Sequence, residues 1–315
     1  MGNSQNGKED MDYDKMIKNF SYIQDINHFQ LGNIKIYDAI ENKNHKIFQY
    51  KRLCQSDQQL QQLRNHFIER KKLINEHLIR VFYVMGKESV MCSDTSHVVI
   101  LGEYFGNSLQ QEHEYNLNQK MIFNESRLWL IIYQIIQCCA YLEEQGKYHG
   151  DLKIDHVYLD LDGSIKLIEH NLIPGSLNPY QKALYNNEFH AFSPEMLNLL
   201  QQSEDKEKQY SKLDILTLNK SDVFSFGMMI LELASQFETK QYYDWEAKTM
   251  NYQQIISSIQ FLTNRGYSTI FQNLLLQMCL QDIGERPGFQ EMRIGLQSLE
   301  NDILSHTAFY RSHIK

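Results

Sequence analysis

The sequence predicts an α+β protein with two lobes, a small one rich in strands and a larger one that is mainly helical. Three observations support this fold class. Strand-like alternation of apolar and polar residues fills most of residues 33–104. One amphipathic helical pattern interrupts it, and beyond residue 125 apolar residues recur mostly at helical spacing. The 315 residues are enough for two lobes with a sizeable core.

The small lobe begins with two predicted strands, residues 33–40 and 47–53, which are joined by a polar turn signal. Residues 56–76 then predict an amphipathic helix with Ser56 or Asp57 as its N-cap. Two further strand-like runs follow. This lobe is therefore predicted to be a sheet with one helix.

The large lobe begins with a long predicted helix over residues 125–147, where Gly146 is a plausible stop. Two short strand signals follow, joined by the turn Asp162-Gly163. After an irregular stretch, residues 174–193, four more helical segments complete the chain. The order of elements indicates one helical lobe rather than a repeat.

Composition excludes several functional classes. A net charge of −8 argues against a nucleic-acid binder. Five cysteines without a C-x-x-C pair argue against a disulfide framework or a four-cysteine zinc site, and predict a reducing, cytoplasmic location. The most apolar run, residues 128–136, is too short to span a bilayer. Membrane contact is expected only if Gly2 is myristoylated, and Asn6 lacks the hydroxyl preferred for that modification.

Four sequence motifs follow one another in the large lobe. They are YHGDLKIDHVYLD (148–160), HAFSPE (190–195), KSDVFSFGMMILEL (220–233) and GERP (284–287). They resemble the catalytic loop H-R-D-L-x-x-x-N, the A-P-E segment, the helix after it and the late arginine motif of eukaryotic protein kinases. Because all four occur in the right order, the chain resembles the protein kinase-like superfamily, of the Ser/Thr type, from about Phe29 to Leu299.

This resemblance implies a bilobal protein kinase-like fold, in which the small lobe is an antiparallel β-sheet with one helix. The expected parts are a polar N-terminal extension (1–28), a kinase-like domain (29–302) made of a small lobe (29–104) and a helical lobe (105–302) with an exposed insertion (201–212), and a C-terminal tail (303–315).

Several kinase positions keep their usual residues, which makes ATP an expected ligand. Lys51 matches the lysine that grips the α- and β-phosphates. Asp151 matches the residue that orients the substrate hydroxyl, and Lys153 matches the one that helps to hold the γ-phosphate. Gly32 and Glu103 match the remaining glycine of the glycine-rich loop and the acidic residue of the connection between the lobes.

The expected magnesium site is altered. His156 stands where the family has a metal-binding Asn, and Glu169 replaces the Asp of Asp-Phe-Gly, followed by His170 and Asn171. Magnesium prefers hard oxygen ligands, whereas imidazole suits zinc, copper or nickel. The sequence therefore predicts poor Mg²⁺ binding. A transition-metal cluster that includes His156, Glu169 and Asp151 is a weaker hypothesis than ordinary internal packing.

The nucleotide site also departs from the family. Ile34 and Tyr37 match later glycines of the phosphate-binding loop. Gln49 is expected to occlude the adenine pocket, and Gly102 to enlarge its back.

Two positions on the small-lobe helix could match the glutamate that, in kinases, pairs with the lysine matched by Lys51. Counting from residues 77–82 puts Phe67 at that position, and Glu69 lies two residues further on. Either the register is shifted or the ion pair is absent.

Positions with a structural role are retained. Glu195 and Arg286 match an ion pair that ties the activation segment to the helical lobe. Asp222 matches a residue that accepts hydrogen bonds from the catalytic-loop backbone. Retained scaffold residues beside altered metal and glycine-loop residues favour a pseudokinase.

Three functional hypotheses follow. The first is a catalytically impaired pseudokinase that binds other proteins as a scaffold, as an allosteric partner of an active kinase or as part of a large assembly. The second is a divergent, active Ser/Thr protein kinase that uses Lys51, Asp151, Lys153 and Glu169. The third is a kinase fold that binds ATP without transferring phosphate.

Overall fold

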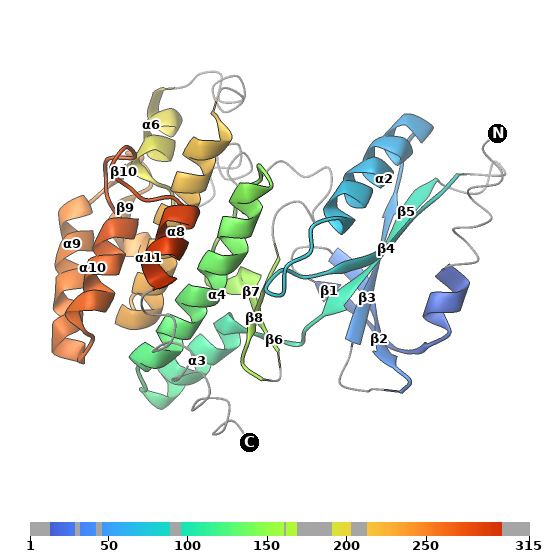
Figure 1. Cartoon of the computed structure of the whole chain (residues 1–315), viewed down its shortest axis with the longest axis horizontal. Helices are drawn as coiled ribbons and strands as arrows, with labels where there is room; N and C mark the ends of the chain where they lie inside the picture. Colours follow the sequence, from blue (N-terminus) through green and yellow to red (C-terminus); the bar gives the residue numbers. More distant parts are fainter. Residues whose placement is uncertain are drawn as a thin grey trace. The chain divides into compact units, whose positions relative to one another are not determined.

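The computed structural model describes residues 13–28, 32–41, 46–88, 96–160, 162–168, 191–202 and 213–297. The chain divides into two units (Figure 1): the described residues of unit 1 end at Gly106, and those of unit 2 begin at Asn107. Unit 1 contains a sheet and one long helix, and unit 2 is mainly helical. The α+β fold class predicted from the sequence is confirmed. Most of the expected insertion 201–212 and the whole C-terminal tail 303–315 lie outside the described residues.

Unit 1 is built on a five-stranded antiparallel sheet with the strand order β1-β2-β3-β5-β4. The strands are β1 (Phe20–His28), β2 (Gly32–Ala39), β3 (Lys46–Leu53), β4 (Val81–Lys87) and β5 (His97–Tyr104). Helix α2 (Asp57–Lys71) begins after the N-cap Ser56, whose side chain accepts a hydrogen bond from the Gln59 N–H. It buries Leu60, Leu63 and Phe67.

The strand register fixes which side chains face α2. A Cβ built on Gly86 of β4 would meet Leu60 and Arg64 of α2, so Gly86 points at the helix. Gly86 pairs with Val98, and paired residues share a face of the sheet. The α2 face therefore carries alternate residues of each strand, namely Ile34, Ile36, Phe48, Tyr50, Arg52, Val84, Gly86, Val98, Ile100 and Gly102.

The opposite side, called the far face, carries the residues in between, which are Lys35, Tyr37, Ile47, Gln49, Lys51, Met85, Val99 and Leu101. A short helical segment, residues 13–17, packs on the far face through Tyr13, Met16 and Ile17. Both faces of β3 are therefore covered by apolar groups.

Strand β1 lies in a segment expected to be a polar extension, residues 1–28. It pairs with β2 along its whole length and is an edge strand of the sheet. A bulge between Tyr22 and Gln24 breaks the two-residue period, and Tyr22 and Ile23 are exposed. These features removed the alternation by which a strand is usually detected.

Unit 2 is a helical unit with two small sheets. Its helices are α3 (Leu109–Gln119), α4 (Glu125–Glu144), α6 (Pro194–Gln202), α8 (Ile215–Ser235), α9 (Tyr252–Phe261), α10 (Thr269–Met278) and α11 (Phe289–Leu296). Short 3-10 turns occur at η1 (Ile154–His156), η3 (Thr239–Tyr242) and η4 (Leu262–Arg265). The small sheets are β6-β7-β8 (Asn107–Ser108, Val157–Leu159, Ile165–Leu167) and β9-β10 (Tyr243–Asp244, Thr249–Met250).

Helices α4 and α8 form the centre of unit 2. Helix α4 packs against α8 and α11, and α8 is buried along most of its length. Asp214 caps α8, because its side chain accepts a 2.7 Å hydrogen bond from the Thr217 N–H. Within the described part of the chain, neither these helices nor any other is long and apolar enough to cross a membrane.

Candidate functional site: the catalytic loop and the β3 strand

The loop between α4 and β7 is held by one buried carboxylate of α8. Asp222 accepts hydrogen bonds from the His149 N–H at 2.7 Å and from the Gly150 N–H at 3.0 Å. Gly150 has a φ of +81°, a left-handed conformation that glycine adopts without strain. Because hydrogen bonds to an ionised acceptor are strong, Asp222 fixes the loop that carries Asp151. This is the contact that the kinase resemblance implies for Asp222.

Asp151 lies buried between a lysine and a histidine. Lys153 Nζ is 3.6 Å from one carboxylate oxygen of Asp151, and His156 Nδ1 is 3.1 Å from the other. His156 Nδ1 is also 2.7 Å from the Asp151 backbone carbonyl. Because a carbonyl only accepts, this geometry requires the proton on Nδ1. The structure thus brings three of the predicted site residues together.

The side chain at position 156 therefore offers Asp151 an N–H group. An asparagine there would offer an oxygen ligand to a metal, whereas His156 is 2% exposed and is turned toward Asp151. Glu169 and His170, the other proposed metal ligands, lie outside the described residues. Across the described ranges, no group of three or more His, Cys, Asp or Glu side chains is placed to hold a metal ion.

Lys51 does not lie where the resemblance implies. It is exposed on the far face of the sheet, and its neighbour Tyr50 occupies the α2 face with 8% exposure. In kinases this lysine pairs with a glutamate of the helix that α2 matches. The strand register therefore keeps Lys51 apart from α2.

Neither candidate partner on α2 supplies an acid to the sheet. Phe67 is fully buried. Glu69 has a 66% exposed side chain and accepts a hydrogen bond from Lys72 at 2.6 Å. The other carboxylate of α2, Asp57, accepts a hydrogen bond from Ser96. Among the described residues, the lysine–glutamate pair between β3 and the helix is absent.

Gln49 occupies a different place from the expected one. It lies on the far face, where its amide donates to the Tyr13 hydroxyl at 2.6 Å and accepts from the Tyr37 hydroxyl at 2.8 Å. Burial, together with the neighbouring Tyr13, raises the pKa of Tyr37 to about 12. Gln49 thus anchors the helical segment 13–17, and the expected occlusion of an adenine pocket on the α2 side does not occur.

Two further expectations on the small lobe are corrected. The space next to Gly102 is filled by the Phe48 ring, which would lie 2.7 Å from a Cβ built on Gly102. Gly102 therefore does not enlarge the back of an adenine pocket. Gly32 is the first residue of β2, and Ile34 and Tyr37 lie inside that strand rather than in a loop. Residues 29–31, which connect β1 and β2, lie outside the described part.

Glu103 is engaged with the segment before β4. Its side chain accepts a 2.9 Å hydrogen bond from the Arg80 N–H, and its own N–H donates to the Arg80 carbonyl at 2.9 Å. These bonds hold the end of β5 in place.

The Glu195–Arg286 pair is present and well satisfied. Two guanidinium nitrogens of Arg286 lie 2.7 and 3.1 Å from the Glu195 carboxylate, and the remaining donors reach the Lys220 and Leu280 carbonyls. The Arg286 side chain is completely buried and lies 5.0 Å from the Phe224 ring centre. Burial raises the pKa of Glu195, but the guanidinium outweighs it and holds that pKa below its ordinary value.

An acidic groove that sequence reasoning missed lies beside the catalytic loop in unit 2. It has a volume of about 260 Å³, and Lys153, Asp155 and Glu232 contribute its charged groups. Burial raises the pKa of Glu232, against the hydrogen bond from the Thr239 N–H, which lowers it. A single acid in an otherwise apolar part of α8 was the signal that could have identified Glu232.

The fold of the two units and the loop fixed by Asp222 define a protein kinase-like domain. A sequence model of the family described as "Protein kinase domain" matches residues 30–294. The chain therefore belongs to the protein kinase family.

One curated relative is the "Probable serine/threonine-protein kinase mkcF" of Dictyostelium discoideum. It is 27% identical to this chain over 161 residues, which are 51% of this chain and 20% of the relative. The match thus spans about a fifth of the length of that relative.

Proposed function

We propose that this member of the protein kinase family is a pseudokinase, impaired in phosphoryl transfer, that acts by binding other proteins. It would serve as a scaffold, as an allosteric partner of an active kinase, or as one component of a larger assembly. Its buried free thiols, such as Cys139 and Cys279, support a reducing compartment.

The observation that carries this proposal is the orientation of β3. Phosphoryl transfer in kinases depends on positioning and on neutralising charge, and the lysine–glutamate pair must be in place. Here Lys51 faces away from α2, whereas Tyr50 lies buried on the face of the sheet that α2 covers, and Phe67 of α2 is also buried. A tyrosine and a phenylalanine supply neither the positive charge nor its acidic partner. The cation of β3 on this face, Arg52, lies two residues beyond Tyr50 along the strand.

The catalytic loop supports the same conclusion. ATP bound with magnesium would supply the transferable phosphate and the positive charge that neutralises it. The Nδ1–H of His156 donates a hydrogen bond to Asp151. An imidazole is also a poor substitute for the hard oxygen ligands that Mg²⁺ prefers. Among the described residues, the donor set beside Asp151 does not fit Mg²⁺.

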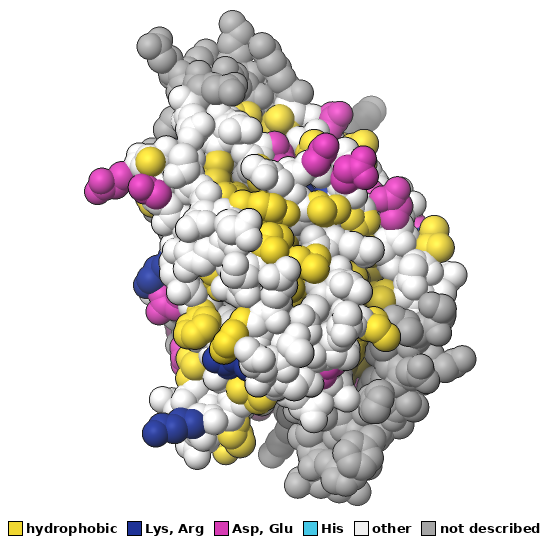
Figure 2. Space-filling model, turned by 90° about the vertical axis from the view of Figure 1, so that its left-hand side faces the viewer, with side chains coloured by type: hydrophobic (Ala, Val, Ile, Leu, Met, Phe, Trp, Pro, Cys, Tyr) yellow, Lys and Arg dark blue, Asp and Glu magenta, His cyan; other side chains and the backbone are white. Residues whose placement is uncertain are grey.

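Binding to proteins requires a stable scaffold and an accessible surface. The buried Glu195–Arg286 pair and the Asp222 contacts support the scaffold. Figure 2 shows one face of unit 2, where apolar side chains gather in small groups among polar ones. Large exposed apolar residues of unit 2 include Phe261 and Ile270, each more than half exposed.

Thermal unfolding tests this function directly. A ligand present at about 100 times its dissociation constant adds roughly 2.7 kcal/mol to the stability of a protein, which is readily seen as a higher melting temperature. We expect no shift with ATP plus Mg²⁺, ATP plus Mn²⁺, or ATP plus EDTA. A shift with ATP in EDTA that persists in Lys51→Ala would favour a kinase fold that binds ATP without transfer, because Lys51 lies on the far face of the sheet. A shift with Zn²⁺ alone, lost in His156→Ala, would favour a transition-metal site.

A divergent, active Ser/Thr kinase is the second candidate. The observation in its favour is that Asp151 and Lys153 are both retained, with the Lys153 Nζ atom 3.6 Å from the Asp151 carboxylate. This candidate requires a melting shift that needs both ATP and a divalent ion, together with phosphate transfer that Asp151→Ala abolishes.

A further inference from the structure

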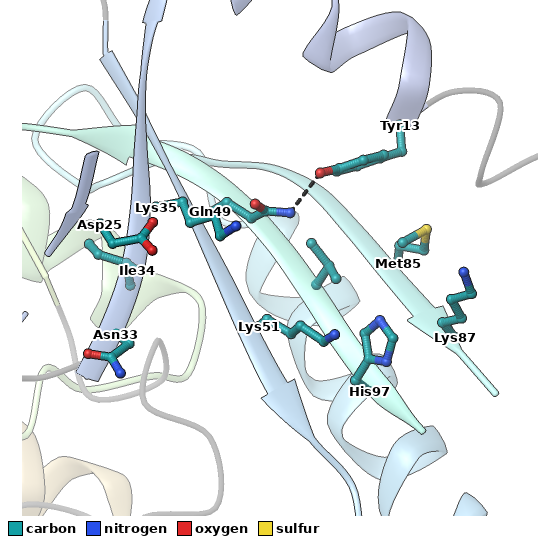
Figure 3. A pocket seen from close by; sticks show the side chains of 11 residues that line it. Tyr13, Asp25, Asn33, Ile34, Lys35, Gln49, Lys51, Met85, Lys87 and His97 are labelled. Carbon is teal, nitrogen blue, oxygen red and sulfur yellow. Dashed lines mark hydrogen bonds between the residues drawn. The ribbon is translucent and has the colours of Figure 1, made fainter. Parts of the chain in front are cut away.

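A pocket of about 370 Å³ lies on the far face of the sheet in unit 1 (Figure 3). Met85 and Val99, both nearly buried, form its apolar floor. The Tyr13 ring forms one wall, and its hydroxyl is fixed by the 2.6 Å hydrogen bond from Gln49. The Tyr13 and Tyr83 ring centres are 5.9 Å apart, so the wall packs on the sheet. The pocket is a built feature, with a fixed aromatic side and an apolar base.

Two lysines and a histidine gather at the end of the pocket away from Tyr13. Lys87 and His97 are direct partners across β4 and β5, and Lys51 pairs with Val99, two residues from His97 on the same face. Figure 3 shows the Lys51 amino group directed toward the His97 ring, with Lys87 on the other side of that ring. Three basic groups thus share one end of the pocket.

Among the described residues that line the pocket, no carboxylate lies beside Lys51 or Lys87. The one carboxylate there, Asp25, pairs with Lys35 across β1 and β2 and lies at the opposite side in Figure 3. Lys51 and Lys87 lie on β3 and β4, on either side of β5, so their two positive charges repel one another across the pocket. The chain as a whole carries a net charge of −8, so this positive group runs against its general composition. A bound dianion would relieve the repulsion.

We propose that this pocket binds a phosphorylated tyrosine side chain of a partner protein. A phosphate monoester carries a charge of about −1.5 to −2 at neutral pH and accepts several charge-assisted hydrogen bonds. Lys51 and Lys87 supply the charge, and His97 supplies a further ring nitrogen. The aromatic ring of the ligand packs on Met85 and Val99 beside the Tyr13 ring.

The spacing of the strand favours an aryl phosphate over a shorter one. Met85 and Lys87 are successive residues on one face of β4, which separates them by roughly 6–7 Å. A ring above Met85 directs its para-phosphate toward the level of Lys87 and His97. A serine phosphate lacks the ring, and it cannot fill the apolar floor and reach both lysines at once.

The edge of the sheet favours a peptide as the bearer of the phosphate. Lys87 ends β4, which is an edge strand of the sheet. An edge strand offers backbone groups to an extended segment that adds alongside it, and such addition is a common mode of peptide recognition. A partner segment can therefore lie along β4 while its phosphotyrosine enters the pocket.

Fluorescence anisotropy with the full-length protein tests this proposal. The probe is a labelled peptide with one phosphotyrosine, compared with the same peptide bearing tyrosine or phosphoserine. We expect measurable binding of the phosphotyrosine peptide, binding at least tenfold weaker for the other two, and displacement by excess phenyl phosphate. Because the contact is electrostatic, the affinity should also fall as salt is raised.

Charge reversals identify the pocket. Lys51→Glu and Lys87→Glu should each weaken binding by about tenfold or more, since each removes a charge-assisted contact and adds repulsion. Lys46→Glu is the matched control, because Lys46 is an exposed lysine of the same strand β3 that does not line the pocket. It should change the affinity by less than twofold. All three residues are exposed, so melting temperatures should stay within a few degrees.

Several results would overturn the proposal. Equal binding of the tyrosine and phosphotyrosine peptides would remove the role of phosphate. Equal losses in Lys46→Glu and Lys87→Glu would mean general charge attraction. Displacement by AMP at a lower concentration than by phenyl phosphate would assign the pocket to a nucleotide. If the ligand binds in the proposed pocket, Lys87→Glu should weaken peptide binding as much as Lys51→Glu does. A nucleotide site under α2 would not show this equality.

Discussion

The catalytic loop of unit 2 and the β3–α2 region of unit 1 have diverged to different degrees from the kinase pattern. In unit 2, Asp222 still fixes the loop, and Arg286 still meets Glu195 through two nitrogens. In unit 1, Tyr50 is buried on the α2 face of β3 and Phe67 is buried on α2, the two elements on which kinases hold a lysine and a glutamate. Buried contacts that maintain the fold are kept in unit 2, whereas the described residues of unit 1 lack the lysine–glutamate pair between β3 and α2.

The largest expected effect concerns the retained pair. Arg286→Ala should lower the free energy of unfolding by about 3–5 kcal/mol, because it leaves the Glu195 carboxylate and two carbonyls without their buried partner. Urea denaturation measures it. Arg293→Ala is the matched control, since Arg293 pairs with Glu144 at a partly exposed site and should cost under about 1 kcal/mol. Equal losses would remove the distinction between the two ion pairs.

The second prediction compares single substitutions at two neighbouring residues of β3, Tyr50 and Lys51. Tyr50→Lys places a charge on the α2 face and should cost about 2–4 kcal/mol of stability. Lys51→Tyr changes an exposed position and should stay within about 0.5 kcal/mol. If Lys51 faced α2 instead, Lys51→Tyr would be the substitution that changes the stability. Thermal and urea unfolding of both variants separate the two registers.

The third prediction concerns pH. The folded-state pKa of Glu195 lies below its unfolded value, so its ionised form stabilises the protein above the unfolded pKa of about 4.3. That contribution is lost as pH falls through the folded-state pKa. Glu195→Gln should therefore cost about 2 kcal/mol at pH 7, and the difference from wild type should shrink below about pH 4. A difference that stays constant with pH would mean that charge plays no part.

The smallest effect concerns the far face. Gln49→Ala removes the hydrogen bonds to Tyr13 and Tyr37 and should cost about 1 kcal/mol. Hydrogen exchange should speed up mainly in residues 13–17, which this amide anchors. Gln24→Ala, an exposed change on β1, should leave exchange there unaltered. Unchanged exchange in Gln49→Ala would mean that apolar packing alone holds the segment.

The sequence predicted the structure well where long motifs identify individual residues. The helical lobe, the loop around Asp151 and the Glu195–Arg286 pair were all anticipated from residues 148–160, 190–195, 220–233 and 284–287. The small lobe was harder, because a shift of one residue moves every side chain of a strand to the other face. Ile47 and Phe48, adjacent in β3, are both nearly fully buried, so alternation carried no information there.

Two other features required three-dimensional contacts. Strand β1 was missed because a bulge and an edge position hide its period. The pocket on the far face combines residues from five strands and the segment 13–17, a set that no single stretch of sequence displays. Glu232 lay in a helix that was predicted, but only its burial and its neighbours Asp155 and Lys153 reveal the groove.

Phosphoryl transfer is the property that tests the pseudokinase proposal most directly. Purified wild-type protein and Asp151→Asn would be incubated with ATP labelled in its γ-phosphate, a generic protein substrate, and Mg²⁺ or Mn²⁺. The account predicts that both proteins give the same background signal. Transfer by the wild type that Asp151→Asn abolishes would contradict the account and identify an active kinase.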